Sequence, residues 1–468
     1  MGSEFDQLHF LLVPLMSQSH IIPLTDFAKL LVQHGLIVSI ITTPLNAIRH
    51  KAAVDHLVEA GLKIQMIPLQ FPSQDVGLPQ GCENMDALPS MELAKDFFVA
   101  SEMLRVPLEK LIGELEPKPN CIISTNALPW TQRVAQKFNI PRYVFETISC
   151  FTLLCSSIMS RASVVDDMVS DSDPILVPDI PHKMEFTKAQ LPEATRKTSS
   201  DDIQGIIDQI KQAQNLARGT LANTFDELEP FYVEGLRKER KNVWCIGPVS
   251  LCNKEFSEKS NRGSKASIDE NFCIKWLDSM KPNSVIYACF GSLCQDTIIQ
   301  QKSKKWLSEE RFQERVEGRG LIIRGWAPQV LILSHPSVGG FLTHCGWNST
   351  LEGVSAGVPM ITWPMFAEQF YNENFIINVL EIGVRIGVKV RMKSAEEEAM
   401  VKRDSVNKAI EKVMGEGEEA KRRRERARKL GKKAVEAMEE GGSSYKNITL
   451  LIQDVMQQDI LGRELSSS

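Results

Sequence analysis

The apolar positions of this chain fall into short runs that alternate with amphipathic helical segments. Short apolar runs bounded by turn residues predict buried strands, and apolar spacings of three and four predict helices. A helix is expected from about Ile22 to Gln33, with Gly35 as its C-terminal cap. Strands separated by helices indicate right-handed crossovers and a parallel sheet covered on both faces. The strands predicted in the first half are Phe10–Leu15, Ile37–Thr43, Lys63–Leu69, Cys121–Thr125, Arg142–Phe145, Thr220–Asn223 and Val243–Ile246.

The pattern stops at a polar stretch and then starts again. Residues 250–270 are rich in Ser, Lys, Glu and Asn and lack apolar periodicity, so they are interpreted as an interdomain linker. The chain is therefore expected to be an α/β protein of two similar domains, 1–249 and 271–440, with a ligand cleft between them. The strands predicted in the second half are Ser284–Phe290, Gly320–Arg324, Val338–Thr343 and Val358–Trp363.

A basic run, Lys421–Lys433, has two interpretations. It could be a nuclear signal or a phosphate-binding strip, or one solvated face of a long helix. Acidic residues flank the run, and Ala427, Leu430, Ala434 and Met438 supply an apolar stripe at helical spacing. The solvated helix is the favoured interpretation.

Composition and charge exclude several classes of protein. The chain has 468 residues, 43% of them hydrophobic and 24% charged, and a net charge of −5. These values exclude collagenous, coiled-coil and largely disordered chains and give no electrostatic reason to expect nucleic acid as a partner. None of the ten cysteines forms a CxxC pair, no apolar run is long enough for a membrane span, and the N-terminus is acidic. A cytoplasmic protein with reduced, buried thiols is expected.

The strongest chemical signal is Trp326–Gln369, a stretch of 44 residues. Val338–Thr343 is its predicted strand, followed by a turn at His344 and by a helix that starts near Asn348 and ends at Gly357. Strand carboxyl ends in open α/β sheets bind ligands, and a helix N-terminus there suits phosphate. His344 and Ser349 add donors, Glu352 can bind sugar hydroxyls, and Trp326 can stack on a base.

This stretch resembles, over its full length, the signature box of the plant family 1 UDP-glycosyltransferases. The likeness extends along nearly the whole chain, through SHIIP, LPW, WCIGP and FGS. It implies two Rossmann-like domains facing across a cleft (GT-B type), with UDP-sugar on the second domain and the acceptor on the first. The helix in 441–468 would return to the first domain.

The resemblance also assigns roles to individual residues. Trp326 and the Ala327 backbone would recognise uracil, and Gln329 and Glu352 the ribose. The phosphates would be held by His344, Asn348 and Ser349, with Ser292 of FGS also at the donor site. Trp347, Glu368 and Gln369 would face the sugar, and a terminal Gln goes with glucose donors.

Each of these residues has a plain structural explanation when taken alone. Trp326 could be a core aromatic, and a Ser at a helix start is most often only a cap. Their joint occurrence at the family spacing favours the site. Asn348-Ser349-Thr350 is a glycosylation sequon, and a glycan there would block the phosphate site, which also favours a cytoplasmic setting.

His20 is the candidate general base. It follows the first predicted strand, in the turn Ser17–His20, and a neutral imidazole there could take a proton from an acceptor hydroxyl. The alternative is an ordinary surface histidine; the turn context and the SHIIP match favour catalysis.

The sequence departs from the family pattern in two places. Thr125 stands where the family has an Asp that stabilises the protonated base, and threonine cannot balance an imidazolium. Only 28 residues lie between Ser292 and Leu321, whereas two helices and a strand need roughly 40. A strand–helix unit is therefore expected to be missing at 293–320.

Two functions are therefore weighed. One is an inverting enzyme that transfers glucose from UDP-glucose to a hydroxyl of a small lipophilic plant metabolite, as a monomer, without cofactor or metal. The other is an impaired or inactive relative that at most binds UDP-sugar or a partner. The acceptor pocket is expected in the loops Gln70–Leu88 and Asp166–Lys197.

Overall fold

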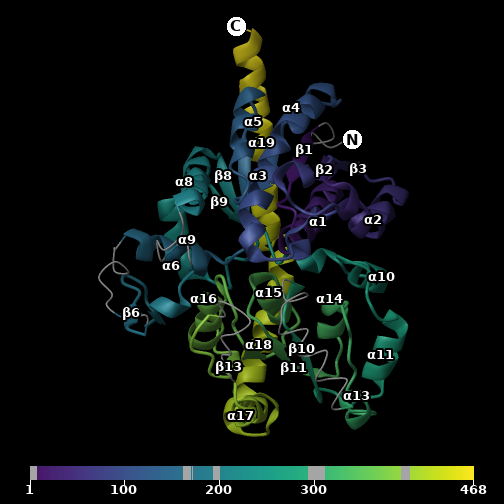
Figure 1. The fold of residues 1–468 in the computed structure, drawn as a ribbon, viewed down its shortest axis with the longest axis vertical. Helices are drawn as coiled ribbons and strands as arrows, with labels where there is room; N and C mark the ends of the chain where they lie inside the picture. The colour runs from purple at the N-terminus through teal and green to yellow at the C-terminus, as the bar shows by residue number, and fades with distance from the viewer. Residues whose placement is uncertain are drawn as a thin grey trace.

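The strands form two separate parallel sheets and one short antiparallel pair. The structure, a computed structural model, describes residues 8–161, 170, 172–192, 195, 201–292, 311–391 and 401–467. Figure 1 shows the elements of the first sheet above those of the second, with the last two helices running along both. The predicted α/β class with two parallel sheets is confirmed.

The first sheet contains all seven strands predicted for the first half. Its order is β3-β2-β1-β4-β5-β8-β9, and every neighbouring pair is parallel. The order reverses between β1 and β4, and such a switch point is where open α/β sheets bind ligands. The strands are β1 (His9–Val13), β2 (Ile37–Thr42), β3 (Ile64–Pro68), β4 (Cys121–Thr125), β5 (Arg142–Glu146), β8 (Gly219–Ala222) and β9 (Val243–Cys245).

Helices connect these strands. The long helices of this half are α1 (Gln18–Gln33), α2 (Pro44–Glu59), α3 (Ala94–Met103), α4 (Arg105–Glu114), α5 (Trp130–Lys137), α6 (Cys150–Arg161), α8 (Asp201–Leu216) and α9 (Pro230–Glu239). Short 3-10 turns are η1 (Gln74–Val76), η2 (Met85–Ala87), η3 (Met91–Leu93), η4 (Lys188–Gln190) and η5 (Val249–Cys252).

Helix α1 begins earlier than predicted. Ser17 is its N-cap residue, so His20 lies in the first helical turn and not in a loop before the helix. The prediction was misled by Pro23, which normally marks a helix start but here lies inside the helix. Gly35 has φ +85°, the left-handed conformation expected of a glycine just after a helix.

A small hairpin in the first half was not predicted. β6 (Pro174–Leu176) pairs antiparallel with β7 (Glu185–Thr187) inside the expected acceptor loop 166–197. Strands of three residues are too short to show an alternating pattern. Positions 166–169, 171, 193–194 and 196–197 of that loop lie outside the described residues.

The second sheet has the order β10-β11-β12-β13 and is also parallel. Its last strand was not predicted. The strands are β10 (Val285–Cys289), β11 (Val338–Thr343), β12 (Met360–Thr362) and β13 (Gly383–Arg385). The helices of this half are α11 (Glu270–Asp278), α13 (Phe312–Arg315), α14 (Gln329–Leu333), α15 (Trp347–Ser355), α16 (Gln369–Asn374), the π-helical turn η7 (Phe375–Val379), α17 (Arg403–Met414), α18 (Glu418–Met438) and α19 (Ser443–Ser467).

The strand predicted at Gly320–Arg324 is wrong, because these residues are irregular in the structure. A strand needs a neighbour to satisfy its backbone groups. β10 pairs with β11 along one edge, and among the described residues no strand pairs with its other edge. The strand–helix unit expected to be missing would have supplied that neighbour, although 293–310 of the shortened segment lie outside the described residues.

The segment 250–270 is more ordered than a plain linker. It begins within η5 and includes a short helix, α10 (Phe256–Ser260), which a Glu255 capping box starts. Both elements have many contacts: η5 with α1, and α10 with α14 of the second half. The segment therefore packs against both halves.

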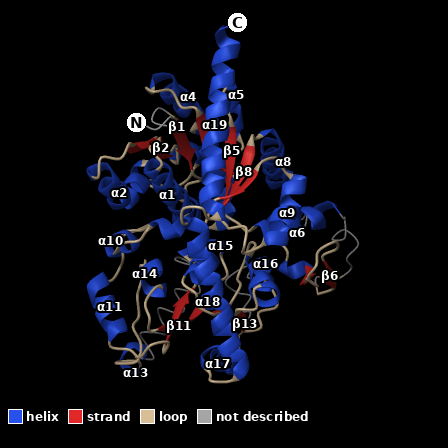
Figure 2. Ribbon diagram, turned by 180° about the vertical axis from the view of Figure 1, so that it is seen from behind, coloured by secondary structure: helices blue, strands red, loops and turns tan. Residues whose placement is uncertain are grey.

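The C-terminal helices connect the two sheets. The basic run lies in α18, as predicted, with its lysines exposed and with Ala420, Ala427, Gly431, Ala434 and Ala437 on the inward side. The run is not solvated throughout, because Arg423 is buried and, like Arg424, donates to backbone carbonyls near the end of α17. Figure 2 shows α19 lying across the face of the first sheet. Asn447 and Ser444 of α19 donate to the Cys245 and Gly247 carbonyls at the end of β9. Among the described residues, no helix has the length and apolar character that a membrane crossing requires.

Candidate functional site

The turn after β11 presents His344 at the carboxyl end of the second sheet. Two glycines leave room for its ring: a Cβ on Gly291 or Gly346 would lie 2.8 or 2.4 Å from the His344 Nε2 atom. The ring is half-buried, and burial lowers its pKa to about 4. His344 is therefore neutral at pH 7 and can donate a hydrogen bond without carrying a charge. Ser292, half-buried, follows Gly291 in the turn after β10.

Helix α15 starts directly after this turn. Its N-cap is Gly346, and no side chain caps it there by hydrogen bonding. The backbone N–H of Trp347 donates to the Glu368 carboxylate, whose pKa burial raises. The N–H groups of Asn348 and Ser349 belong to the same first turn, where an anion is stabilised by the helix dipole. A phosphate could bind at this end of α15.

Three of the predicted donor residues form one hydrogen-bonded group. Gln329 Nε2 donates to Ser349 Oγ over 2.9 Å and to Glu352 Oε2 over 2.8 Å. Ser349 and Glu352 lie on α15, and Gln329 begins α14. The structure thus brings together the two predicted ribose residues and one predicted phosphate residue.

Trp326 lies beside the linker segment. Its backbone N–H donates to Ser267 Oγ over 3.0 Å, and its carbonyl accepts from the Ser267 N–H over 2.8 Å. Gly263, with φ +87°, approaches so closely that a Cβ there would lie 2.4 Å from Trp326 Cζ2. The Ala327 carbonyl accepts from the Gln329 N–H. The indole is half-buried, so part of its surface stays accessible.

The residues expected to face the sugar are constrained by other contacts. The Trp347 indole is 2% exposed and donates to the Asn223 carbonyl of the first half, so in this structure its ring packs between the halves. Gln369 Oε1 accepts from the N–H groups of Met365 and Phe366 over 2.8 and 3.1 Å. Because Oε1 is engaged in this way, the Gln369 Nε2 donor is the part of the amide left for a sugar.

His20 lies opposite the start of α15. Pro23 has no N–H to donate to the Ser19 carbonyl four residues earlier. Asn348 Nδ2 donates to that free carbonyl over 2.8 Å and so joins α15 to α1. The residue next to His20 therefore touches the predicted phosphate site.

The electrostatics of His20 suit a base. The ring is half-buried, and burial lowers its pKa to about 4, so it is neutral at pH 7. Its Nδ1 atom is buried and has no hydrogen-bond partner among the described residues. A neutral imidazole with a free nitrogen can accept a proton from a bound hydroxyl.

Thr125 does not act as a partner of His20 in this structure. Its Oγ1 atom accepts from the Leu15 N–H over 2.9 Å, and the side chain is fully buried at the end of β4. The next residue, Asn126, donates to Glu146 Oε2 over 2.8 Å. Glu146 in turn pairs with Arg240 at 2.9 Å. Glu146, the carboxylate bound by the residue after Thr125, is thus engaged with Arg240.

Sequence reasoning missed two charged residues at the site. Arg262 in the linker pairs with Glu352 Oε1 at 2.6 Å and with Asp26 Oδ2 at 2.7 Å. Asp26 could have been noticed, because it is an acid on the apolar side of α1. Arg262 gave no signal, since a single arginine in a polar segment is ordinary.

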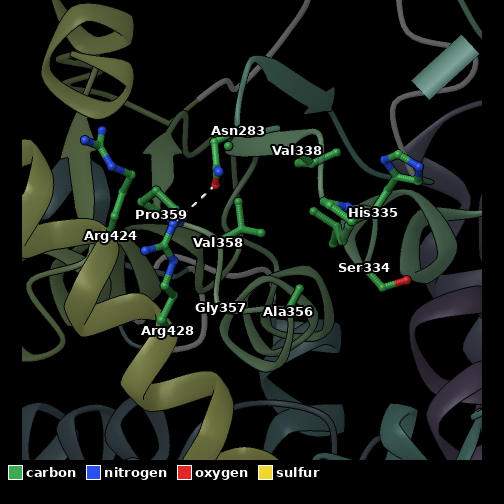
Figure 3. Close-up of a pocket in the computed structure, with 13 residues that line it drawn as sticks. Asn283, Ser334, His335, Val338, Ala356, Gly357, Val358, Pro359, Arg424 and Arg428 are labelled. Atoms are coloured by element: carbon green, nitrogen blue, oxygen red, sulfur yellow. Dashed lines mark hydrogen bonds between the residues drawn. The ribbon is translucent and has the colours of Figure 1, made fainter. Parts of the chain in front are cut away.

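A pocket at the other end of the second sheet belongs to a different region. Figure 3 shows it lined by residues that precede β11 and β12, among them Pro359, and by Arg424 and Arg428 of α18. Arg428 donates to Asn283 over 3.4 Å. The candidate site lies at the carboxyl ends of the strands, so this pocket is not part of it. In the described part of the chain, no group of His, Cys, Asp and Glu is arranged to hold a metal ion.

Comparisons with known proteins identify the family and the fold. Residues 313–419 match the family described as UDP-glucoronosyl and UDP-glucosyl transferase. UDP-glycosyltransferase 73C5 of Arabidopsis thaliana is 45% identical over 96% of this chain and 97% of its own length. The crystal structure of Glycyrrhiza uralensis UGT73P12 with glycyrrhetinic acid 3-O-monoglucuronide has a TM-score of 0.88 at 32% identity and 98% coverage of both chains. Arabidopsis thaliana UGT89C1 with UDP-L-rhamnose has a TM-score of 0.73 at 28% identity, covering 96% of this chain and 99% of that one.

Proposed function

Because the chain belongs to the plant family 1 UDP-glycosyltransferases, which have the GT-B fold, we propose that it transfers glucose from UDP-glucose to a hydroxyl of a small lipophilic plant metabolite, with inversion. One observation carries the proposal. The hydrogen-bonded group Gln329–Ser349–Glu352 lies at the open start of α15, and Asn348 of the same turn touches the residue beside His20. The proposed base, His20, and the proposed phosphate site at the start of α15 therefore lie on the two halves of the molecule, where the halves meet.

The proposed reaction is a single displacement. The His20 imidazole takes the proton of the acceptor hydroxyl, and the oxygen bonds to the anomeric carbon on the face opposite UDP. The bond between that carbon and the β-phosphate oxygen breaks, and the electron pair leaves with UDP. The N–H groups of Asn348 and Ser349 and the His344 donor stabilise the charge on the leaving phosphate.

The choice of donor sugar rests on Gln369, because family members use different sugars. The UGT89C1 structure holds UDP-L-rhamnose, whereas another neighbour, from Polygonum tinctorium, is described as a UDP-glucosyltransferase. The Gln369 Nε2 donor is oriented by two backbone contacts, so it can distinguish one hydroxyl configuration from another.

The acceptor pocket is proposed in the two variable loops. The loop 70–88 packs near the end of β1. Its residues Phe71, Leu78, Cys82 and Leu88 belong to the same buried hydrophobic cluster as Met16, which follows β1. Apolar residues next to His20 favour a lipophilic acceptor. The UGT73P12 crystal structure is a complex with glycyrrhetinic acid 3-O-monoglucuronide, which supports an acceptor of this class.

The second candidate function is an impaired relative that binds UDP-sugar without efficient turnover. Thr125 and the short segment at 293–320 favour it. The alignment with UDP-glycosyltransferase 73C5 spans 480 positions, yet 96% of this chain is only about 449 residues. About 31 aligned positions thus have no residue in this chain, which supports the missing unit.

Further properties are part of the same proposal. The domains are 1–249 and 271–440, with 441–468 returning to the first. The protein works in the cytoplasm as a monomer, without metal or other cofactor. EDTA should leave binding and turnover unchanged, and sedimentation should give the mass of one chain, 52.5 kDa.

Calorimetry with UDP tests the function directly. The chain should bind UDP, and Trp326→Ala should weaken binding by about 1–3 kcal/mol, the usual value of stacking between a base and an aromatic ring. Trp326→Phe, which keeps a ring, is the matched control and should lose less. Equal affinity of the parent and the Ala variant would contradict the assignment of Trp326.

A further inference from the structure

The linker places a buried guanidinium between the two halves of the molecule. Arg262 pairs at 2.7 Å with Asp26 of α1 and at 2.6 Å with Glu352 of α15. The three side chains are only 11%, 6% and 5% exposed, respectively. Burial alone would lower the pKa of Arg262, but the attraction of the two carboxylates outweighs burial and raises it.

The same segment also covers the edge of Trp326. A Cβ on Gly263 would lie 2.4 Å from Trp326 Cζ2 and 2.9 Å from Ile22 Cδ1 of α1. Ser267 exchanges two hydrogen bonds with the Trp326 backbone. The linker therefore contacts both Trp326, the residue proposed to stack on uracil, and Glu352, the residue proposed to bind the ribose.

The carboxylate of Glu352 is held from both sides. Arg262 binds its Oε1 atom and Gln329 its Oε2 atom, which fixes the plane of the group. Each carboxylate oxygen has a second lone pair, so both can still accept from a hydroxyl. Without Arg262, the two buried carboxylates would lose the guanidinium that lies between them, and Glu352 would be held by Gln329 on one side alone.

We infer that Arg262 is a positioning residue for the nucleotide: it orients Glu352 toward the ribose hydroxyls and couples this orientation to helix α1. The inference rests on the proposed function, since it requires a ribose at Glu352. It adds that nucleotide affinity depends on a linker residue that does not touch the nucleotide.

Calorimetry on the full chain with UDP and with 2′-deoxy-UDP separates this role from general support of the fold. The parent should prefer UDP. Arg262→Gln should weaken UDP binding about tenfold to a hundredfold, the usual effect of losing a hydrogen bond to a charged group, and 2′-deoxy-UDP binding much less. Arg262→Lys should fall between, because an ammonium cannot bridge two carboxylates as a planar guanidinium does.

Lys29→Gln is the matched control. Lys29 lies on α1, and its ion pair with Glu258 of α10 joins the same helix to the same linker without reaching Glu352. This variant should keep the parent's ratio of UDP to 2′-deoxy-UDP affinity. Thermal melts of the unliganded variants report any general loss of stability.

The outcomes are distinguishable. Equal losses for both nucleotides in Arg262→Gln and Arg262→Lys would make Arg262 merely structural and overturn the inference. Tighter UDP binding would show that Arg262 blocks the ribose site, and unchanged binding would show no role; both overturn it. A parent chain that binds no UDP would overturn the proposed function itself, and this inference with it.

Discussion

His20 and its surroundings show how burial alone can prepare a base. Desolvation lowers its pKa to about 4, and its Nδ1 atom has no hydrogen-bond partner among the described residues. The neutral ring can accept a proton at pH 7, but in the described part of the chain no carboxylate pairs with the imidazolium that would form. Thr125, which stands at the expected position, donates nothing to His20 and accepts from Leu15. Proton transfer from the acceptor hydroxyl to His20 should therefore be slow, because the positive charge that forms on the ring is not stabilised.

Thr125→Asp should raise turnover. A carboxylate there can still accept from the Leu15 N–H, and it would stabilise the protonated His20. By comparison with orienting carboxylates in hydrolase triads, the gain should reach about two to four powers of ten in kcat. The measurement is steady-state kinetics with an acceptor that the protein binds, in a chain with the missing unit restored if the parent shows no turnover.

Two further variants serve as controls for Thr125→Asp. Thr125→Asn has a similar shape without the charge and should give no such gain, while His20→Ala should abolish turnover. The added carboxylate also raises the pKa of His20, so the acidic limb of the pH–rate profile should move to higher pH. An unchanged rate in Thr125→Asp would refute the pairing of these positions.

Gln369 should set the preference for glucose through its amide nitrogen. Its Oε1 atom is used by two backbone N–H groups, so Gln369→Glu can keep those bonds while it replaces the amide donor with a charged acceptor. The parent should prefer UDP-glucose over UDP-galactose, and the variant should lose about tenfold of that preference. Competition between the two donors measures it. If the parent uses both equally, Gln369 does not select the sugar.

The sequence predicted that several residues of the candidate donor site would lie together, but it did not predict their contacts. The spacing of Trp326, Gln329, Ser349 and Glu352 indicated one site, and the structure brings the last three into direct contact. The role of Arg262 could not be predicted, because its partners come from elements far apart in the chain. Local pattern carries information about a helix or a turn, but not about which distant side chains meet.

At the scale of elements, strands within apolar runs were predicted, and three-residue strands that include Pro, Gly or charged residues were not. All seven strands of the first sheet match predicted runs, and the three-residue strands β9 and β12 also lie in such runs, whereas β6, β7 and β13 contain Pro174, Glu185, and Gly383 with Arg385, respectively. The apolar segment Gly320–Arg324 shows the opposite error. Its residues suit a strand, but a strand also requires a neighbour, which a local pattern cannot reveal.

Asp454 is one of several side chains that attach helix α19 to the first sheet. Asp454 accepts from Tyr143 of β5 over 2.6 Å and from Arg218, just before β8, over 2.6 and 3.1 Å. Although burial would raise the pKa of Asp454, these hydrogen bonds lower it. Asp454→Asn should reduce the free energy of unfolding by about 1–2 kcal/mol, because a charged acceptor of three donors is lost. Urea denaturation measures the change.

An exposed ion pair on the neighbouring helix α18 provides the control for Asp454→Asn. Glu425 and Lys429 of α18 pair at 3.0 Å with both side chains more than half exposed. Glu425→Gln should change the free energy of unfolding by less than about 0.5 kcal/mol. Equal effects of the two substitutions would mean that Asp454 does not hold α19 on the sheet.

At the scale of the whole molecule, the two halves meet through specific polar contacts. Asn348 reaches the Ser19 carbonyl, Trp347 reaches the Asn223 carbonyl, and Arg262 bridges Asp26 and Glu352. Each contact involves a residue of the candidate donor site. Binding at that site and the arrangement of the two halves are therefore expected to influence each other.

The same buried groups should make the fold sensitive to acid. Burial lowers the pKa of His20, His50 and His344 to about 4 and also lowers that of His9. In the unfolded chain a histidine titrates near 6.5. Between pH 6.5 and pH 4 the unfolded chain therefore binds more protons than the folded one, so stability is present above this window and is lost as the pH falls through it.

His50 allows this loss of stability to be measured at a histidine that has no proposed catalytic or binding role. It is 1% exposed on α2, and burial, followed by the charges of Arg49 and Arg262, lowers its pKa. A group shifted from 6.5 to about 4 should lose about 2 kcal/mol of stabilisation between pH 7 and pH 5. His50→Gln should therefore flatten the fall in unfolding free energy over that range, as measured by urea denaturation at each pH. His56→Gln, on the same helix with a side chain 59% exposed, should leave the slope unchanged. If His50→Gln loses as much unfolding free energy between pH 7 and pH 5 as the parent does, His50 is protonated alike in both states, and the neutral form assigned to the buried histidines loses its support.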